Sequence, residues 1–485
     1  MKKLSYLIFL PVLVVSMVSC KKLIEIEETD FIDESIALKT VANTESALLG
    51  AYNQFNPEFD IRLSSVFSDE LKPGEFYNAA STHEWQYTSN DIGIRDTYTA
   101  ITNFYYVIDR VNRVLRRLPL ADSMSVSDGA LRARVKGECL FLRALCHFGI
   151  FQWYCDNYSA DGVAMPYMEE PSLVPPARIG MTPYFEKLEN DLREAKLLIP
   201  AAQPDIYRAS RLSVVGLQAR VALYKRDWPS AITFSTEFIN AVPLADATAF
   251  KNIWTDAGSA ELGLKIRRTT ANGRMGSFYR GLFTRPSASA PLVAPGSIPW
   301  TPSDKLFNSY DQTNDVRFSS YVIDEPLLQN IPGKPSKLVA KYAGTGYATT
   351  AENVNDIKFF RTGEMYLIRA EARAETGAFT GAASAESDLN DLRAARITGY
   401  TPVILGSTQG AISEIMNERF KELAYEGHRF FDLKRRGLPI ERLASDAPNE
   451  GARTLPANNF RFILPIPQVQ MQANPNMVQN PGYVD

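Results

Sequence analysis

The sequence predicts a mainly α protein in which pairs of helices stack side by side and long irregular segments lie between them. Apolar residues recur at spacings of three and four in a series of segments that come in pairs, which is typical of amphipathic helices. Two of these pairs align with each other, which indicates a repeated helical unit. The stretches between the pairs have no helical period and are rich in Gly, Pro, Ser, Thr and aromatic residues, as irregular structure is.

The expected helices can be placed in chain order. Ile101, Tyr105 and Ile108 lie on one face of a first helix. Thr182 as N-cap and Pro183 at the first helical position predict the start of another. We expect helices over residues 98–117 and 129–153, 182–198, 213–225 and 229–240, 364–375 and 385–396, and 412–425 followed by 429–436.

Two helix pairs overlay at an offset of 150 residues, since Leu217 and Ala222 fall on Leu367 and Ala372. The second pair, Arg361 to Arg396, spans 36 residues, close to the ~34 of a tetratricopeptide unit. Small residues in such units let two antiparallel helices pack closely, and neighbouring units bury both faces. We therefore expect about four helix pairs, within about residues 98–240 and 361–436.

The irregular stretches cover about residues 70–91, 244–335 and 438–485. Loops of this length in a folded protein are usually functional. Because the 244–335 stretch interrupts the helix pairs in sequence, we expect it to fold over them as a second layer, with 438–485 wrapping the body.

The N-terminus has the features of an export signal. Lys2 and Lys3 precede an apolar run over residues 4–18, which is too short to span a bilayer as a helix. Met17-Val18-Ser19-Cys20 resembles a lipobox, with Met17 where Leu is usual. We expect a signal peptide over 1–19, acylation of Cys20 and a flexible leader over 20–30. The alternative is an ordinary cleaved signal in which the cysteine is incidental.

The net charge and the cysteines bear on possible ligands and on disulfide formation. The formal charge is −3 for the whole chain, and removal of residues 1–19 takes away two lysines and no acid, which leaves −5. This mild acidity argues against nucleic-acid binding. Cys139, Cys146 and Cys155 remain, and the first two would lie about 10 Å apart along one helix, too far for a disulfide. We expect them to be small buried hydrophobic residues.

Several sequence blocks resemble one known family. The longest runs from Glu418 to Gly437 and contains Glu426-Gly427-His428-Arg429-Phe430-Phe431-Asp432-Leu433-Lys434-Arg435. The other blocks are Gly137-Glu138-Cys139-Leu140-Phe141-Leu142-Arg143-Ala144, Arg361 to Glu371, Leu389-Asn390-Asp391-Leu392-Arg393, Leu464-Pro465-Ile466-Pro467 and Asn480-Pro481-Gly482-Tyr483. Together they resemble SusD/RagB-type lipoproteins from one end of the chain to the other.

The resemblance implies a single SusD-like body over residues 31–485. In that body four tetratricopeptide-like helix pairs form a right-handed solenoid that carries an irregular, loop-rich, ligand-facing layer. It also implies a place at the outer membrane, lipid-anchored and facing the cell exterior. The implied partner is a SusC-like TonB-dependent barrel, over which the lipoprotein sits as a hinged lid. The implied cargo is an oligosaccharide, or a peptide in some relatives, with no cofactor and no enzymatic activity.

The charged C-terminal block admits two interpretations. Glu422 and Glu426 lie one helical turn apart and Asp432 follows His428 by four, so paired carboxylates could serve acid/base catalysis in a glycoside hydrolase. The same spacing of three and four suits an ion-pair network that locks two adjoining helices, and the family motif favours this. We therefore predict a structural network of Glu422, Glu426, Arg429, Asp432 and Arg435, and no catalytic residue.

A metal site has little support in the sequence. Asp311, Thr313 and Asp315 alternate like the first ligands of a calcium loop, but the glycine and the closing glutamate of that motif are missing. His83, His147 and His428 are far apart, and no Cys/His cluster suggests zinc. Calcium binding by Asp311 and Asp315 stays an open alternative.

Aromatic residues on the irregular stretches are the candidates for sugar binding. Flat apolar rings pack on the C–H face of a sugar, and amide or guanidinium groups bind its hydroxyls. The candidates are Phe76, Tyr77, Asn78, Trp85 and Tyr87 in one loop and Tyr279, Arg280, Phe283 and Trp300 in the other. Each ring alone fits core packing as well, but we expect at least two of the set to contact cargo. Trp85→Ala or Trp300→Ala should then weaken binding and leave the fold intact.

Other aromatic residues are expected to fill the core. Trp153, Tyr154, Trp228 and Trp254 lie on or beside predicted helices, where aromatic side chains usually pack inward. A non-catalytic scaffold whose loops bind a partner protein remains an alternative to nutrient capture.

Overall fold

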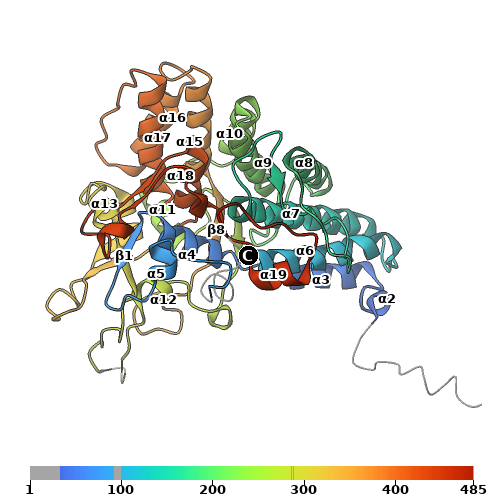
Figure 1. The fold of residues 1–485 in the computed structure, drawn as a ribbon, viewed down its shortest axis with the longest axis horizontal. Coiled ribbons are helices and arrows are strands. Elements are labelled where there is room, and N and C mark those ends of the chain that lie inside the picture. Colours follow the sequence, from blue (N-terminus) through green and yellow to red (C-terminus); the bar gives the residue numbers. More distant parts are fainter. Residues whose placement is uncertain (1–32, 92–99, 286, 288, 484–485) are drawn as a thin grey trace, which may run out of the picture.

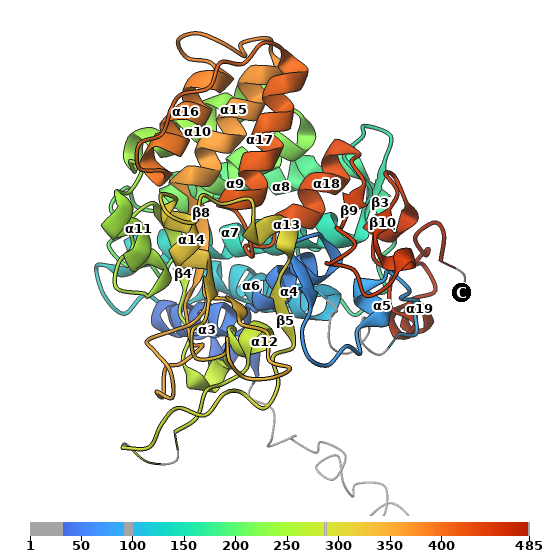
Figure 2. The ribbon, with the colours of Figure 1, turned by 90° about the vertical axis from the view of Figure 1, so that its left-hand side faces the viewer.

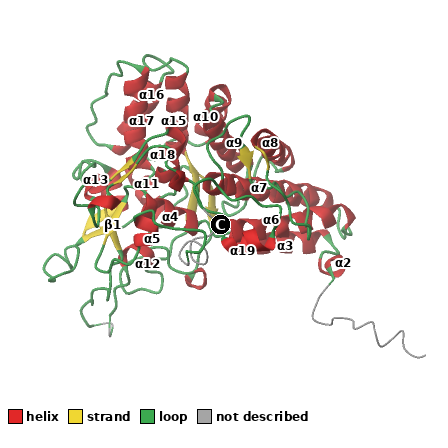
Figure 3. Ribbon diagram, in the orientation of Figure 1, coloured by secondary structure: helices red, strands yellow, loops and turns green. Residues whose placement is uncertain are grey.

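The computed structural model describes residues 33–91, 100–285, 287 and 289–483. The expected signal peptide, Cys20 and the leader lie outside the described residues. Helices dominate the molecule, and the strands are short (Figures 1 and 3). None of the helices in the described part of the chain is long and apolar enough to cross a membrane.

The long helices pack in a chain of neighbours. Helix α3 contacts α6, and successive contacts then run through α7, α8, α9 and α10 to α15, which packs on α16 and α17 (Figure 1). Their bounds are α3 Val41–Gln54, α6 Ala100–Arg117, α7 Asp128–Tyr154, α8 Met181–Leu198, α9 Arg211–Lys225, α10 Trp228–Ala241, α15 Thr362–Glu375, α16 Ala385–Arg396 and α17 Thr408–Glu422. Each predicted helix is present, whereas α3 was not predicted. The right-handed sense of the array stays a prediction.

Local sequence determines where these helices begin. Ser210 and Ser213 form a reciprocal capping box at the start of α9, and the Asp227 side chain accepts the backbone N–H of Ser230 at the start of α10. The predicted start of α8 is wrong by two residues, because the N-cap is Gly180 and not Thr182. The helix begins at Met181, so Thr182 lies inside it and its hydroxyl donates to the carbonyl of Ala160 at 2.9 Å.

Besides the long helices, the described residues form five two-stranded antiparallel sheets and several short helices. The pairs are β1 Leu71–Pro73 with β5 Trp300–Pro302, β2 Val163–Ala164 with β3 Ile179–Gly180, β4 Leu262–Ile266 with β8 Ile357–Arg361, β6 Val322–Asp324 with β7 Lys337–Val339, and β9 Ile440–Glu441 with β10 Thr454–Leu455. The short helices are α2 Glu34–Ala37, α4 Glu58–Phe67, α5 Ala80–His83, α11 Ala247–Trp254, α12 Ser277–Arg280, α13 Asp304–Phe307, α14 Val316–Tyr321, α18 Arg429–Arg436 and α19 Gln468–Ala473. Figure 2 shows α15 to α17 at one end of the molecule and α12 toward the other.

One large core joins the helices to the irregular layer, and a smaller one lies among α15, α16 and α17. Trp153, Tyr154 and Trp254 are buried, and Trp228 packs against the large core. As predicted, the three cysteines are buried free thiols. At Gly216 a Cβ atom would lie 2.6 Å from Cβ of Phe360, so this glycine lets α9 approach the end of β8.

Helix α18 and the C-terminal wrap together cap the end of α7, the longest helix of the described residues. Lys434 Nζ donates to the carbonyls of Gln152 and Cys155 at 2.8 and 2.6 Å, and Asn480 Nδ2 donates to the carbonyl of Tyr154 at 3.1 Å. A cation at this end also opposes the negative pole of the helix dipole. Burial lowers the pKa of Lys434 from 10.5 to about 8. The family-like block around Lys434 thus closes α7.

Candidate functional site

Strands β1 and β5 bring the two candidate loops together. Lys72 pairs with Thr301 in the antiparallel register, and the pairing continues through the Gly74 N–H, which donates to the carbonyl of Pro299 at 2.9 Å. The loop that starts at Gly74 therefore lies against the segment that ends in Trp300. The two sequence stretches with the most candidate ligand residues form one continuous layer.

Six of the nine candidate residues are buried within this layer. Trp85 is 4% exposed, its Nε1–H donates to the carbonyl of Phe67 at 2.9 Å, and the Arg442 guanidinium lies 4.2 Å from its ring. Tyr279 is fully buried and stacks on Tyr342. The buried set is Trp85, Tyr87, Tyr279, Arg280, Phe283 and Trp300, each at most 6% exposed. The expectation that these side chains present a surface to cargo does not hold in this conformation, because they form the core that supports the loops.

The remaining three candidates lie next to one another at the surface. Phe76 is 69% exposed and Asn78 is also exposed, whereas Tyr77 is half-buried. Tyr77 Oη donates to Glu84 Oε1 at 2.7 Å, and burial together with Glu84 raises the pKa of Tyr77. Tyr77 therefore fixes the loop, and Phe76 and Asn78 are the groups left to meet a ligand.

Arg280 is a buried cation with few polar contacts. It is 1% exposed and lies 4.8 Å from the Tyr347 ring centroid and 5.8 Å from that of Phe283. Within the described residues its Nε and Nη2 atoms have no hydrogen-bond partner. This guanidinium supports the irregular layer through ring contacts and does not reach the surface.

The charged side chains of the network predicted in the C-terminal block are largely buried, and each forms at least one ion pair. Glu422 is fully buried and contacts three guanidinium groups, at 2.8 Å from Arg361, 3.1 Å from Arg396 and 3.3 Å from Arg317. These cations hold the pKa of Glu422 well below its usual range. A carboxyl group in such a setting does not carry the proton that a general acid must donate.

The other members of the block also form ion pairs, and most partners lie outside the block. Only Asp432 and Arg435 pair with each other, at 2.8 Å, among the described contacts. The further pairs join Glu426 to Lys341 and Arg361, Arg429 to Asp69, Asp432 to Arg419, and Arg435 to Glu371. The block therefore links α17 and α18 to α15, β8, and the turn between α4 and β1.

The candidate calcium ligands are engaged by the protein itself. Asp311 accepts the backbone N–H groups of Thr313 and Asn314, each at 3.0 Å, and Asp315 pairs with Arg317 at 2.8 Å. Among the residues that the structure describes, no three His, Cys, Asp or Glu side chains gather where a metal ion could bind.

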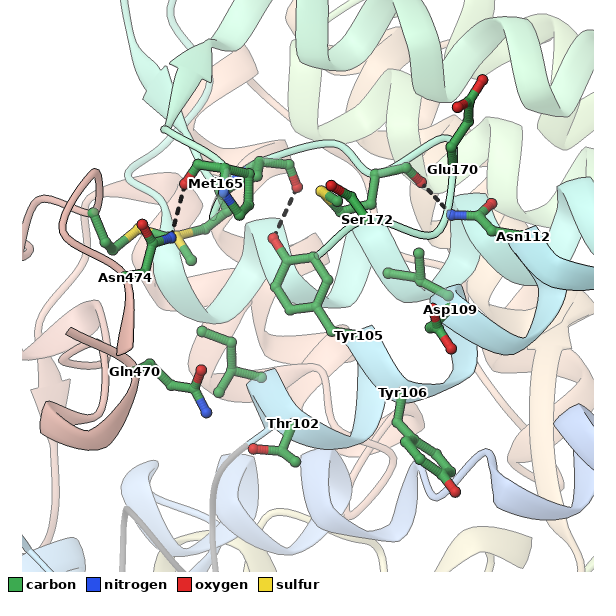
Figure 4. Close-up of a pocket in the computed structure, with 16 residues that line it drawn as sticks. Thr102, Tyr105, Tyr106, Asp109, Asn112, Met165, Glu170, Ser172, Gln470 and Asn474 are labelled. Atoms are coloured by element: carbon green, nitrogen blue, oxygen red, sulfur yellow. Dashed lines mark hydrogen bonds between the residues drawn. The ribbon is translucent and has the colours of Figure 1, made fainter. Parts of the chain in front are cut away.

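Two sizeable cavities open on the described surface. One, of about 410 Å³, lies between α6, the 165–176 segment and α19, and is shown in Figure 4. The other, of about 1040 Å³, lies between the 156–163 loop and the C-terminal wrap. Arg178 and Lys434 line the larger one, but both donate to backbone carbonyls at the end of α7, so these cations have a structural role. Sequence reasoning identified neither cavity, since each is built from segments far apart in the chain.

Helices that pack in series and carry a layer of loops and short strands make this a mainly helical protein with two layers. Two family models match, one described as the SusD family over residues 329–483 and one described as "Starch-binding associating with outer membrane" over residues 30–223. The chain belongs to the SusD family.

Known relatives match along most of the chain. SusD-like protein P38 of Formosa agariphila is 21% identical, over 96% of both chains, and SusD-like protein P25 of the same organism is 23% identical, over 80% of this chain and 79% of the relative. A SusD superfamily protein from Bacteroides thetaiotaomicron has a TM-score of 0.76 at 23% identity, covering 91% of this chain and all of that chain. Surface glycan-binding protein A from the same organism, solved with laminarihexaose, has a TM-score of 0.70 at 20% identity, covering 91% and 99%. These likenesses show the SusD fold.

Proposed function

We propose that this protein is a lipid-anchored, carbohydrate-binding protein of the outer cell surface that captures an oligosaccharide and passes it to a SusC-like TonB-dependent transporter. Family membership supports this, as do structural neighbours described as laminarin-binding or as bound to laminarihexaose. The observation that carries the proposal is the exposed ring of Phe76 beside the exposed amide of Asn78, on a loop fixed by the β1–β5 pairing.

The chemistry of this surface suits a sugar. The Phe76 ring offers an apolar face for the C–H side of a pyranose, and the Asn78 amide offers both a donor and an acceptor to its hydroxyls. The nearby carboxylates are already bound, Glu75 to Lys334 at 2.7 Å and Glu84 to Tyr77. The cargo is accordingly bound without being hydrolysed. A glycoside hydrolase using Glu422 or Asp432 is disfavoured, because both carboxylates are buried in ion pairs.

Binding can be tested with the mature protein on a glycan array that includes laminarin oligosaccharides, followed by calorimetry with the tightest binder. Phe76→Ala should weaken affinity by about tenfold or more, since covering a Phe side chain contributes about 1.5–3 kcal/mol. Asn78→Ala should weaken it by about threefold to tenfold. Tyr106→Ala, which removes a 49% exposed ring from α6, is the matched control and should leave affinity unchanged.

Two results would overturn the assignment. Unchanged affinity in both Phe76→Ala and Asn78→Ala would remove the loop as the site. A loss confined to Tyr106→Ala would instead place the sugar near the cavity of Figure 4. Absence of binding to any glycan would refute the function itself.

The anchor and the transporter partner belong to the same proposal. Acylation of Cys20 is expected to give a mature N-terminus whose mass exceeds that of the unmodified residue by the acyl groups. Mass spectrometry of the N-terminal peptide tests this, and Cys20→Ala should release the protein from membranes. The description of the N-terminal family model, which names the outer membrane, supports the location. Co-purification of a TonB-dependent barrel with the tagged lipoprotein tests the partner.

A further inference from the structure

The cavity of Figure 4 differs in chemistry from the Phe76 surface. Its volume of about 410 Å³ lies near the lower end of the ~300–1,000 Å³ typical of ligand pockets. Buried Ile101, Ile108 and Met165 line it, together with Met168 and Met477. Methionine side chains adapt to irregular apolar partners, which suits a pocket for a hydrophobic group.

Three polar side chains that line the cavity, those of Tyr105, Asn112 and Asn474, are hydrogen-bonded within the protein (Figure 4). Tyr105 Oη donates to the carbonyl of Pro166 at 2.8 Å, and Asn474 Nδ2 donates to the carbonyl of Pro176 at 2.8 Å. Asn112 uses both ends of its amide, donating to the carbonyl of Met168 and accepting from Arg143. These three side chains therefore have little hydrogen-bonding capacity left for the hydroxyls of a sugar, which favours an occupant with an apolar group.

The rim of the cavity continues into exposed apolar residues. Leu173 and Val174 are 101% and 73% exposed, in the same segment that supplies Ser172 and Pro176 to the lining. Amide groups from the C-terminal wrap hold this segment, since Asn476 Nδ2 donates to the carbonyl of Pro175 at 2.9 Å. Two largely exposed aliphatic side chains beside an apolar pocket are typical of a protein-binding surface.

The lining is also acidic. Its sixteen residues include Asp109 and Glu170 and no Lys, Arg or His. Asp109 pairs with Arg113 at 2.7 Å, whereas Glu170 is exposed and forms no ion pair with any described residue. An occupant with a positive charge next to its apolar group would complement Glu170.

We propose that this cavity and its rim, Leu173 and Val174, bind a peptide segment of a partner protein through one aliphatic side chain next to a basic residue. The aliphatic side chain enters the pocket between Met165, Met168 and Met477, the adjoining apolar surface covers Leu173 and Val174, and the basic residue faces Glu170. A buried anchor side chain that fills a desolvated pocket is the usual form of a protein-binding hot spot. This surface is separate from the Phe76 loop and does not depend on carbohydrate binding.

Methyl NMR of the mature protein with ¹³C-labelled methionine tests the proposal, because three methionines line the cavity. The probes are acetyl-Leu-Arg-amide, acetyl-Leu-Glu-amide, acetyl-Gly-Arg-amide and laminarihexaose. We expect acetyl-Leu-Arg-amide to shift the methyl signals of Met165, Met168 and Met477 in a saturable manner at millimolar concentration. Acetyl-Leu-Glu-amide should bind up to about fivefold more weakly, the range of one exposed ion pair, and acetyl-Gly-Arg-amide should give no saturable shift.

Two variants complete the design. Glu170→Gln should reduce the preference for acetyl-Leu-Arg-amide over acetyl-Leu-Glu-amide, and Thr102→Trp should block the cavity from the exposed start of α6. Thr233→Trp adds the same bulk to an exposed position on α10 and should change nothing. The remaining methionine signals report whether each variant is folded.

Other outcomes would overturn the inference. Saturable shifts with laminarihexaose and none with the leucine peptides would make the cavity a carbohydrate site. No saturable shift with acetyl-Leu-Arg-amide, or equal affinity for both leucine peptides in wild type and Glu170→Gln, would remove the aliphatic-basic segment as the occupant.

Discussion

Replacement of Glu422 by glutamine should strongly destabilise the protein. The carboxylate is fully buried and lies within 3.3 Å of nitrogen atoms of Arg361, Arg396 and Arg317. The glutamine side chain is neutral, so the replacement removes a negative charge and leaves the charges of three buried guanidinium groups partly uncompensated. Removal of one partner from a buried ion pair costs about 3–5 kcal/mol, so we expect a loss in this range.

The assay is guanidinium unfolding followed by tryptophan fluorescence and circular dichroism, with Glu414→Gln as the matched control. Glu414 lies on the same helix and pairs with Arg393 at 2.8 Å, but its side chain is 42% exposed. Its replacement should cost at most about 1 kcal/mol. Equal loss of stability in the two variants would refute the structural role of Glu422, and a retained fold with lost hydrolysis of a glycan would restore the catalytic interpretation.

Three further predictions follow from buried groups. Burial raises the pKa of Glu70 from 4.5 to about 7, so the folded state keeps a proton that the unfolded chain loses. The free energy of unfolding should therefore fall by about 3 kcal/mol as the pH rises from about 5 to 8. Glu70→Gln should flatten this dependence when unfolding is measured at a series of pH values. Lys434→Met keeps the apolar stem but loses two bonds to α7, and should cost about 2–4 kcal/mol in denaturant unfolding, with faster hydrogen exchange at the end of α7. Trp85→Ala should cost about 3–5 kcal/mol in unfolding, whereas Phe76→Ala should stay within about 0.5 kcal/mol; a stable Trp85→Ala variant with lost glycan affinity would contradict the burial argument.

Helix periodicity predicted the long helices other than α3, because their buried faces are largely apolar. Helix α4 was missed because its buried face includes Ser64 and Ser65, which carry no hydrophobic signal. The hydroxyl of Ser65 is satisfied locally, since it donates to the carbonyl of Ile61 at 2.9 Å. A helix whose buried face contains serines that hydrogen-bond to its own backbone therefore lacks the apolar periodicity by which helices are predicted.

The sequence predicted which loops form the candidate site, but it did not predict which of their side chains are exposed. Phe76 and Trp85 are nine positions apart in one stretch, and nothing local distinguishes them. Trp85 is buried because Arg442, from the C-terminal wrap, covers its ring. The spacing of charged residues in the C-terminal block likewise indicated ion pairs but not their partners. Arg317 and Arg396, which contact Glu422, come from segments far away in the chain.

Helices α10 and α15 pack directly on each other although about 120 residues separate them in the chain. Closing a loop of this length costs about 3 kcal/mol more than closing a four-residue turn, so the intervening segment must offset this entropy through its own packing. During synthesis α10 can pack on α9, but the side of α10 that contacts α15 stays uncovered until α15 has been made. Changes to the segment between α10 and α15 should therefore also alter how readily these two helices come together during folding.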